Sequence, residues 1–486
     1  MKKFAFTILA LFGILTTVIL IRAAGFNSRQ IHSEPLQAIG VDRAALVKRL
    51  AEAIRFKTLS LQEPAHSHSD EFLRFHAFID RSFPRLRQSL NKESIGSYSL
   101  LYTWLGKDKG LKPLLLMAHM DVVPVEAATE SSWHQPPFSG RVAEGLIWGR
   151  GAMDDKASVM GLLEAVEHLL ESGFEPQRTV YLAFGHDEEI GGNSGAAKIA
   201  GLLQSRGLEL EYVLDEGLNI FNGIVPGISA PVALIGVAEK GYLTLQLTAE
   251  SPGGHSSAPP EHTAITVISR ALQRLEGRPF PTRLSEPTRK MFEFLGPEMS
   301  WTKRLALANL WLFDPLLRKQ LTRSPLTNAL VRTTMTPTIF HAGVKENVLP
   351  TKASAVINLR LAPGETVAGA IAHVRAAIED PNVSVNSLSA QMEPSSVSDT
   401  QSTSFAWVHR TIRQTAPQAL VAPALLVAAT DSRHYQALTK NIFRFLPITL
   451  GPDDTKRYHG IDERIAIDDY ERCVSFYAQL IRNSQP

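Results

Sequence analysis

The sequence predicts an α/β fold in which a mostly parallel sheet, covered by helices, carries a smaller inserted α+β domain. Short, uninterrupted apolar runs alternate with helical stretches in the first half of the chain. Near residue 236 they give way to alternating apolar and polar residues, and the first pattern returns near residue 390. A chain of 486 residues is also too long for one typical domain.

The first 24 residues are predicted to be a membrane anchor or a signal segment. Two lysines precede an uncharged, mostly apolar run of 18 residues, 4–21, which ends at Arg22 and is just long enough to span a bilayer. A signal peptide usually has a shorter apolar core, and Arg22 would lie inside its cleavage region near Ala23. We therefore prefer an uncleaved anchor to secretion after cleavage. In both cases the body is exported to the periplasmic or extracytoplasmic side.

The first domain is predicted to begin at residue 41, after a tether at 25–40, and its first part ends at 236. Apolar residues at helical spacing predict helices at 41–56 and 69–90. Three apolar runs predict buried strands separated by helices; the strands lie at 113–117, 179–184 and 211–214, and the helices at 156–172 and 194–206. Apolar strands separated by helices indicate a parallel sheet covered on both faces.

The second domain is predicted at residues 237–389, inserted into the first. Its β-α-β-α-β pattern places elements at 242–250, 261–276, 352–361, 365–379 and 382–388. Within it, residues 279–323 form a predicted helical insertion. The first domain resumes at 390–486 and closes with a helix at 468–482.

Composition excludes several classes of function. The formal net charge of +2 provides no basic field for nucleic acid. Cys473 is the single cysteine, which rules out an internal disulfide and a cysteine-rich zinc site. Any metal ion must therefore be held by His, Asp and Glu.

Acidic residues and histidines follow each of the three apolar runs. The runs continue, in order, into His119-Met-Asp121, His186-Asp-Glu-Glu189 and Asp215-Glu216, and a further pair, Asp154-Asp155, begins the helix at 156–172. Ligands bind at the carboxyl ends of parallel strands, so these groups are expected at one rim of the sheet. A single Glu-Glu pair is usually a solvated loop, but clusters at three strand ends are a stronger signal.

Carboxylates gathered at one rim repel each other by roughly several kcal/mol unless a counter-charge is present. A divalent cation removes this repulsion. With His and carboxylate ligands, zinc is the expected ion, and cobalt or manganese are alternatives. His119 and Asp121 are two residues apart and face the same side of a strand. One can bind the metal while the other orients it.

Seven motifs occur in the order found in one enzyme family: Ala118-His-Met-Asp-Val-Val-Pro124, Gly149-Arg-Gly-Ala-Met-Asp-Asp-Lys156, Asp187-Glu-Glu-Ile-Gly-Gly192, Leu214-Asp-Glu-Gly217, Gly254-His-Ser-Ser257, Thr430-Asp-Ser-Arg-His-Tyr435 and Tyr458-His-Gly460. The chain resembles the co-catalytic zinc peptidase and deacylase family that includes aminoacylase, acetylornithine deacetylase and glutamate carboxypeptidase. It is most similar to the branch of carboxypeptidase S (Gly-X carboxypeptidase) and the N-fatty-acyl amino acid hydrolases. The resemblance covers residues 40–486.

The resemblance implies two zinc ions per subunit and a role for each matching residue. The implied ligands are His119, Asp154, Glu189, Glu216 and His459, with Asp154 bridging both ions. Asp215, next to Glu216, remains an alternative ligand. Asp121 orients His119, and Glu188 is the implied general base. A cis peptide between Asp154 and Asp155 is also expected.

The resemblance makes the inserted domain a lid that carries His255, which polarises the scissile carbonyl. Asn347 and Arg360 of the lid, and Arg433 of the first domain, are implied to contact the substrate and its free carboxylate. In the family the lid often dimerises, and its histidine can serve the partner's active site. Short members lack the insertion at 279–323, which counts against simple lid dimerisation. We expect that insertion to be extra lid core or a dimer contact, with an acyl channel or a membrane surface as the alternative.

The expected function is zinc-dependent cleavage of the amide bond next to a free C-terminal amino acid, as in a Gly-X carboxypeptidase. Hydrolysis of N-acyl amino acids, including fatty-acyl ones, is the alternative, because the two substrates differ only on the acyl side. A binding protein without catalysis is a minor alternative, and the loss of Glu188 or of a ligand would favour it. A serine hydrolase is disfavoured because no Gly-x-Ser-x-Gly motif occurs.

Overall fold

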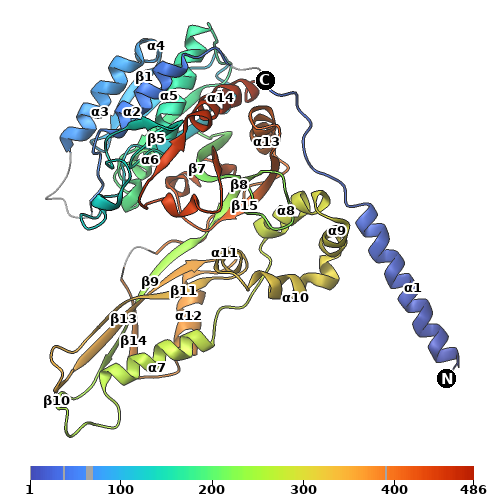
Figure 1. Cartoon of the computed structure of the whole chain (residues 1–486), viewed down its shortest axis with the longest axis vertical. Helices are drawn as coiled ribbons and strands as arrows, with labels where there is room; N and C mark the ends of the chain where they lie inside the picture. Colours follow the sequence, from blue (N-terminus) through green and yellow to red (C-terminus); the bar gives the residue numbers. More distant parts are fainter. Residues whose placement is uncertain (1, 37–38, 62–68, 389–390) are drawn as a thin grey trace.

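The computed structural model describes residues 2–36, 39–61, 69–388 and 391–486. Two globular units are connected by a narrow crossing of chain segments, and helix α1 (Lys2–Ala24) projects away from both (Figure 1). The predicted junction at 389–390 lies outside the described residues.

The larger unit is built on an eight-stranded sheet in the order β1-β2-β6-β3-β7-β16-β8-β15. These strands are β1 (Asn91–Ile95), β2 (Ser99–Trp104), β3 (Leu114–His119), β6 (Val180–Gly185), β7 (Tyr212–Phe221), β8 (Val232–Glu239), β15 (Leu420–Leu426) and β16 (Ile442–Leu450). β3 is parallel to β6 and β7, and β16 is parallel to β7. β2 is antiparallel to both β1 and β6, and β8 runs opposite to β7 and β16. The predicted α/β sheet is confirmed, with its parallel strands at the centre.

Helices cover both faces of this sheet because successive residues of each central strand point to opposite sides. On β3, Leu114 and Leu116 join the larger core with α2 (Arg43–Ile54), α5 (Lys156–Glu171) and α14 (Ile467–Asn483). Leu115 and Met117 face a separate core with α6 (Ala196–Ser205). The helix predicted at 69–90 is two helices, α3 (Ser69–Ser82) and α4 (Pro84–Ser89), because a proline cannot continue a helix and is favoured in its first turn.

The smaller unit is a four-stranded antiparallel sheet in the order β11-β13-β9-β14, with two helices packed against it. Its elements are β9 (Gly241–Glu250), α7 (Ala264–Gly277), β11 (Thr334–Ala342), β13 (Lys352–Leu361), α12 (Val367–Ile378) and β14 (Val383–Ser387). The sequence did not predict β11, which is mostly exposed and therefore has no core-facing apolar alternation. At the far tip, β10 (Gly254–His255) pairs with β12 (Val348–Leu349) (Figure 1).

The insertion contains α8 (Glu286–Leu295), α9 (Trp301–Ala308) and α10 (Leu310–Leu321), followed by α11 (Pro325–Ala329). The buried apolar residues of its helices join the core of the larger unit, whereas Phe280, which precedes α8, belongs to the core of the lid. The Phe294 ring of α8, for example, lies 5.9 Å from the ring of Phe405 in α13 (Thr403–Thr415). The expectation of extra lid core is therefore corrected: α8 covers the edge strand β15 of the larger sheet.

The segment predicted as a tether is bound to the larger unit over its described residues. Gln30 exchanges two side-chain hydrogen bonds with the backbone of Val421, of 2.9 and 2.8 Å. The backbone N–H of Leu36 donates to the carbonyl of Gln414 at 2.8 Å. These bonds leave little slack between α1 and the larger unit.

Candidate metal centre

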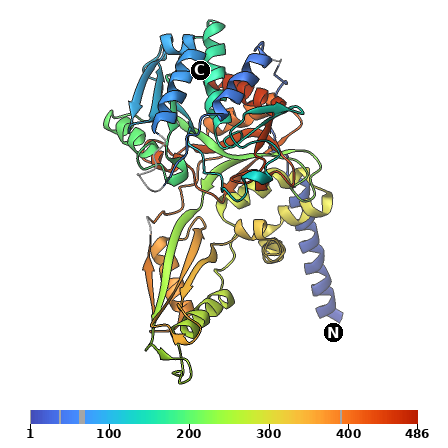
Figure 2. The same ribbon diagram turned by 60° about the vertical axis from the view of Figure 1, so that its left-hand side comes forward.

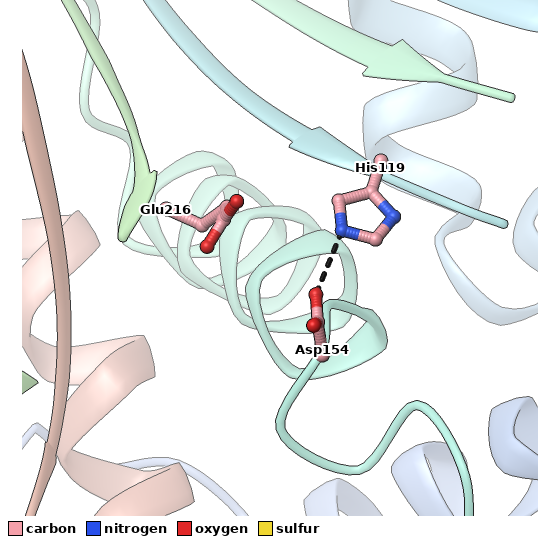
Figure 3. Close-up of side chains that lie close together, drawn as sticks. All are labelled: His119, Asp154 and Glu216. Atoms are coloured by element: carbon pink, nitrogen blue, oxygen red, sulfur yellow. Dashed lines mark hydrogen bonds and ion pairs between the residues drawn. The ribbon is translucent and has the colours of Figure 1, made fainter. Parts of the chain in front are cut away.

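Three side chains from different elements point toward one another at the carboxyl end of the parallel strands (Figure 3). His119 ends β3, Asp154 lies just before α5, and Glu216 lies in β7. The Nε2 atom of His119 is 2.9 Å from Oδ1 of Asp154. The predicted convergence at one rim of the sheet is therefore present.

Three overlapping groups of possible ligand atoms form one cluster, with the atoms of each group within 4.8 Å of one another. Asp154 belongs to two of the groups, together with His119 and Glu216 in one and with Glu189 and His459 in the other. The third group joins His119 to Glu188 and Glu189. Glu189 is also shared by two groups, but Asp154 directs its two oxygens at two different histidines, Oδ1 at His119 and Oδ2 at His459, as a bridging ligand requires.

His459 reaches the cluster from a distant part of the chain. Its Nε2 atom lies 3.2 Å from Oδ2 of Asp154 and 3.1 Å from Oε2 of Glu189. The backbone φ of His459 is 57°, in the left-handed region that non-glycine residues seldom adopt. Such backbone strain is concentrated at functional sites, where the surrounding structure holds it.

Asp121 is fully buried and fixes the positions of its neighbours. Its carboxylate accepts hydrogen bonds from the backbone N–H groups of Glu188 and Glu189, at 3.2 and 3.1 Å, and from the Ser60 hydroxyl at 2.5 Å. Its backbone oxygen lies 3.0 Å from Nδ1 of His119. Asp121 therefore holds the imidazole orientation and the Glu188-Glu189 turn together.

The two adjacent acids of β7 have different surroundings. Asp215 accepts hydrogen bonds from the backbone N–H groups of Glu216 and Ser432, both at 2.9 Å. Among the described residues it belongs to none of the ligand groups, whereas Glu216 belongs to one. The Asp154–Asp155 peptide is cis, as expected.

A buried ion pair that the sequence did not predict connects the loop that carries Asp154 with the loop that carries His459. Glu463 accepts the backbone N–H groups of Met153 and Asp154, at 2.8 and 3.1 Å, and pairs with Arg150 at 2.6 Å. Arg150 also donates to the carbonyl of His459 at 3.1 Å. Arg150 belongs to the Gly149–Lys156 motif, so its importance could have been predicted from the sequence. Glu463 belongs to none of the seven motifs, so nothing in the sequence indicated its role.

The donor set fits a bound cation. Burial raises the pKa of the Glu188 carboxyl well above its usual value, and nearby Asp431 and Glu189 raise it further. Burial and then Asp154 raise the pKa of Glu216 in the same way. Oε1 of Glu189 is buried and has no hydrogen-bond partner in the described part of the chain. A divalent cation would satisfy this atom and allow the carboxylates to stay ionised.

The substrate residues implied by the resemblance do not all lie at this cluster. His255 and Asn347 are exposed side by side at the tip of the lid, where the backbone N–H of Ser256 donates to the Asn347 carbonyl at 3.2 Å. Arg360 is half-buried in β13, with its guanidinium 4.7 Å from the Tyr242 ring. Arg433 is near the cluster and donates to the carbonyl of Gly191 at 2.7 Å. Figure 2 also shows the lid extending away from the larger unit.

Residues 115–483 match the model of a known family, described as peptidase family M20/M25/M40. The chain belongs to this family. The matched residues include every metal-ligand candidate and the whole sheet of the lid, whereas β1 and β2 of the larger sheet precede them. The protein is therefore a hydrolase of the metallopeptidase class, as the motifs predicted.

Relatives within this M20 family agree with the predicted branch. The chain is 44% identical to probable carboxypeptidase S-like 2 of Dictyostelium discoideum, covering 98% of this chain and 93% of that protein. It is 42% identical to the N-fatty-acyl-amino acid synthase/hydrolase PM20D1.1 of Danio rerio, covering 91% and 86%. It is 30% identical to carboxypeptidase S of Saccharomyces cerevisiae, covering 91% and 84%.

Solved structures share the fold. The M20 family metallo-carboxypeptidase Sso-CP2 from Sulfolobus solfataricus matches with a TM-score of 0.67 and 19% identity, covering 90% of this chain and 98% of that one. A dinuclear metal-binding M20 peptidase from Bacillus subtilis matches with a TM-score of 0.54 and 14% identity, covering 90% and 98%. At these identities the matches establish the arrangement of sheets and helices.

Proposed function

We propose that this M20 enzyme hydrolyses the amide bond next to a free C-terminal amino acid, using two zinc ions. The observation that carries the proposal is the shared position of Asp154 in two ligand groups. The relatives named as carboxypeptidases, at 44% and 30% identity, support the substrate class.

His119, Asp154 and Glu216 would hold one ion, and Asp154, Glu189 and His459 would hold the other. Imidazole and carboxylate ligands without cysteine favour zinc, with cobalt or manganese as substitutes. Asp215 is the less suitable ligand because its carboxylate already accepts two backbone N–H groups.

Two ions bound here would polarise the attacking water and the scissile carbonyl. Glu188 accepts a proton from this water while the water oxygen forms a bond to the amide carbon. Glu188 then donates the proton to the leaving nitrogen as the C–N bond breaks, which releases a carboxylic acid and a free amino acid. The hydrogen bond from the Glu188 N–H to Asp121 keeps this base beside the ligands.

The lid would supply the remaining substrate contacts. His255 would donate a hydrogen bond to the developing oxyanion, and Asn347, Arg360 and Arg433 would bind the substrate carboxylate. Because His255 is exposed at the lid tip, this step requires lid closure or delivery to a partner subunit of a homodimer.

Hydrolysis of N-acyl amino acids, including fatty-acyl ones, is the second candidate. It is favoured by 42% identity to a protein named N-fatty-acyl-amino acid synthase/hydrolase. The proposed site is the same for both substrates, because they share the free amino-acid carboxylate and differ only on the acyl side.

The proposal includes membrane anchoring through α1 with the body on the exported side. α1 is the helix in the described chain that is long and apolar enough to span a membrane. The alternative is a signal sequence that is cleaved, with a secreted body.

The experiment is a substrate panel with the metal-loaded, full-length protein. Gly-X dipeptides and N-acyl amino acids of increasing chain length are incubated with it, and the released amino acid is quantified. Release that disappears in Glu188→Gln supports the proposal, and the preferred acyl group decides between the two candidates. No release from any substrate by fully metal-loaded protein would favour the binding-protein alternative.

A further inference from the structure

Helices α9 and α10 expose an apolar surface that the catalytic mechanism does not use. Of the six tryptophans, all within the described residues, Trp301 and Trp311 are the exposed ones, at 50% and 55%. Leu312 and Leu316 of α10 are exposed too, and none of the residues of α10 is fully buried. Exposed tryptophan and leucine on two consecutive helices are typical of the boundary between water and lipid.

The same surface is hydrogen-bonded to the end of α1. Arg304 of α9 donates to the carbonyls of Ala23 and Ala24, at 3.0 and 3.2 Å. Asn309, buried at the α9–α10 junction, donates to the carbonyl of Ile19 at 3.0 Å. Figure 1 shows α9 beside the C-terminal end of α1, with α10 continuing from α9.

The length of α1 determines how close this surface is to the bilayer. Its 23 residues span about 35 Å, and a hydrocarbon core is about 30 Å thick. Ile19 lies five residues before the end of α1, about 7.5 Å along the helix axis. A centred α1 projects only about 2.5 Å beyond each side of this core, so the contact made by Asn309 lies about 5 Å inside its edge, near the boundary between headgroups and acyl chains.

The chain after α1 provides no slack that would lift the body away. A tether at 25–40 could extend to about 50 Å, but its described residues are bound to the larger unit through Gln30 and Leu36. Lys303 of α9 and Lys319 of α10 are exposed on the same two helices, where anionic headgroups would attract them.

We propose that the exposed residues Trp301, Trp311, Leu312 and Leu316 of α9 and α10 lie at the boundary between headgroups and acyl chains of the bilayer that α1 spans. The inference rests on the proposed anchoring by α1. It makes the catalytic body a membrane-surface enzyme with a fixed orientation, in contrast to one that swings on a linker.

The test uses the full-length protein, whose single native cysteine, Cys473, is buried. Leu316→Cys is labelled with the fluorophore NBD and reconstituted, one copy per nanodisc, in phosphatidylcholine and phosphatidylglycerol. The matched control is Leu73→Cys on α3, where Leu73 is 54% exposed. A third variant, Phe12→Cys, reports on α1 itself. Quenching by lipids that carry a doxyl group near the headgroup is measured for each.

The expected result is blue-shifted, lipid-quenched fluorescence at positions 316 and 12, and water-like emission without lipid quenching at position 73. Lipid quenching at 12 without quenching at 316 would overturn this inference and leave the anchor intact. A blue shift at 316 without lipid quenching would mean that protein covers the face, which also overturns it. Absence of lipid quenching at 12 would remove the anchor and the inference with it.

Discussion

The larger unit and the lid hold their functional residues in contrasting states. In the larger unit, His119 and Asp121 are buried, and hydrogen bonds fix the side chains around them before any substrate arrives. In the lid, His255 of β10 and Asn347, which precedes β12, are exposed at the tip. The candidate metal centre is therefore pre-organised, whereas the proposed substrate site would be completed by movement of the lid or by a partner subunit.

Because the two sets of residues lie in different units, substitutions should affect metal binding and catalysis separately. Changes in the lid should lower turnover and leave metal content unchanged. Changes around Asp154 should alter metal affinity first. The variants below test this separation.

The largest effect is expected for Glu188→Gln. The amide cannot accept the water proton, so kcat should fall by about 10²- to 10⁴-fold, while both metal ions remain bound. The matched control is Glu171→Gln, at an exposed position at the end of α5, which should retain normal turnover. Full activity of Glu188→Gln would contradict its role as the base.

The corresponding change in the lid is His255→Ala. Loss of one oxyanion donor should lower kcat by about 10²- to 10³-fold with unchanged metal content. His262→Ala serves as the control because His262 is another exposed histidine of the lid. If His255→Ala lost metal, the lid would belong to the metal centre and the comparison would fail.

Recognition of the substrate carboxylate should have a somewhat smaller effect. An N-acyl amino acid amide leaves a guanidinium unpaired, which costs about 2–3 kcal/mol and lowers kcat/KM about a hundredfold. The comparison of acid and amide substrates is repeated in Arg360→Met and in Arg433→Met. The discrimination should shrink in the variant whose arginine binds the carboxylate. Equal kcat/KM for acid and amide in the unmodified enzyme would show that the carboxylate is not recognised.

The smallest effect is expected for Glu463→Gln. The amide oxygen can still accept the N–H groups of Met153 and Asp154, but the charge that pairs with Arg150 is lost. Metal affinity should fall about tenfold, and excess zinc should restore kcat. Glu471→Gln, which breaks a surface pair with Arg43, should leave metal affinity unchanged. A loss of kcat that zinc does not restore would assign Glu463 another role.

The metal centre could be predicted because its signals are local. Apolar runs end in acids and histidines, and the rule that parallel strands share a carboxyl edge brings His119, Glu189 and Glu216 together. Adjacent acids are harder to distinguish: the roles of Asp215 and Glu216 depend on which side chain meets the Ser432 backbone. Glu463 gave no signal because its partner Arg150 is 313 residues away.

The placement of the insertion could not be predicted either. The apolar stripe of α8 has the same period whether it covers the lid or the larger sheet, so periodicity cannot decide between them. The residues 25–36 are polar enough to look like a tether, and the bonds of Gln30 and Leu36 depend on distant backbone. The positions of α8 and of residues 25–36 both depend on contacts with residues far away in the sequence.

Metal analysis of the purified enzyme tests the central claim most directly, namely that the larger unit alone assembles a centre for two ions around Asp154. The full-length protein is reconstituted with zinc, freed of excess metal and analysed by mass spectrometry alongside His255→Ala and Asp154→Ala. The account predicts close to two zinc equivalents in the unmodified enzyme and in His255→Ala, and a marked loss in Asp154→Ala. Absence of bound zinc in the unmodified enzyme, or full retention in Asp154→Ala, would contradict it.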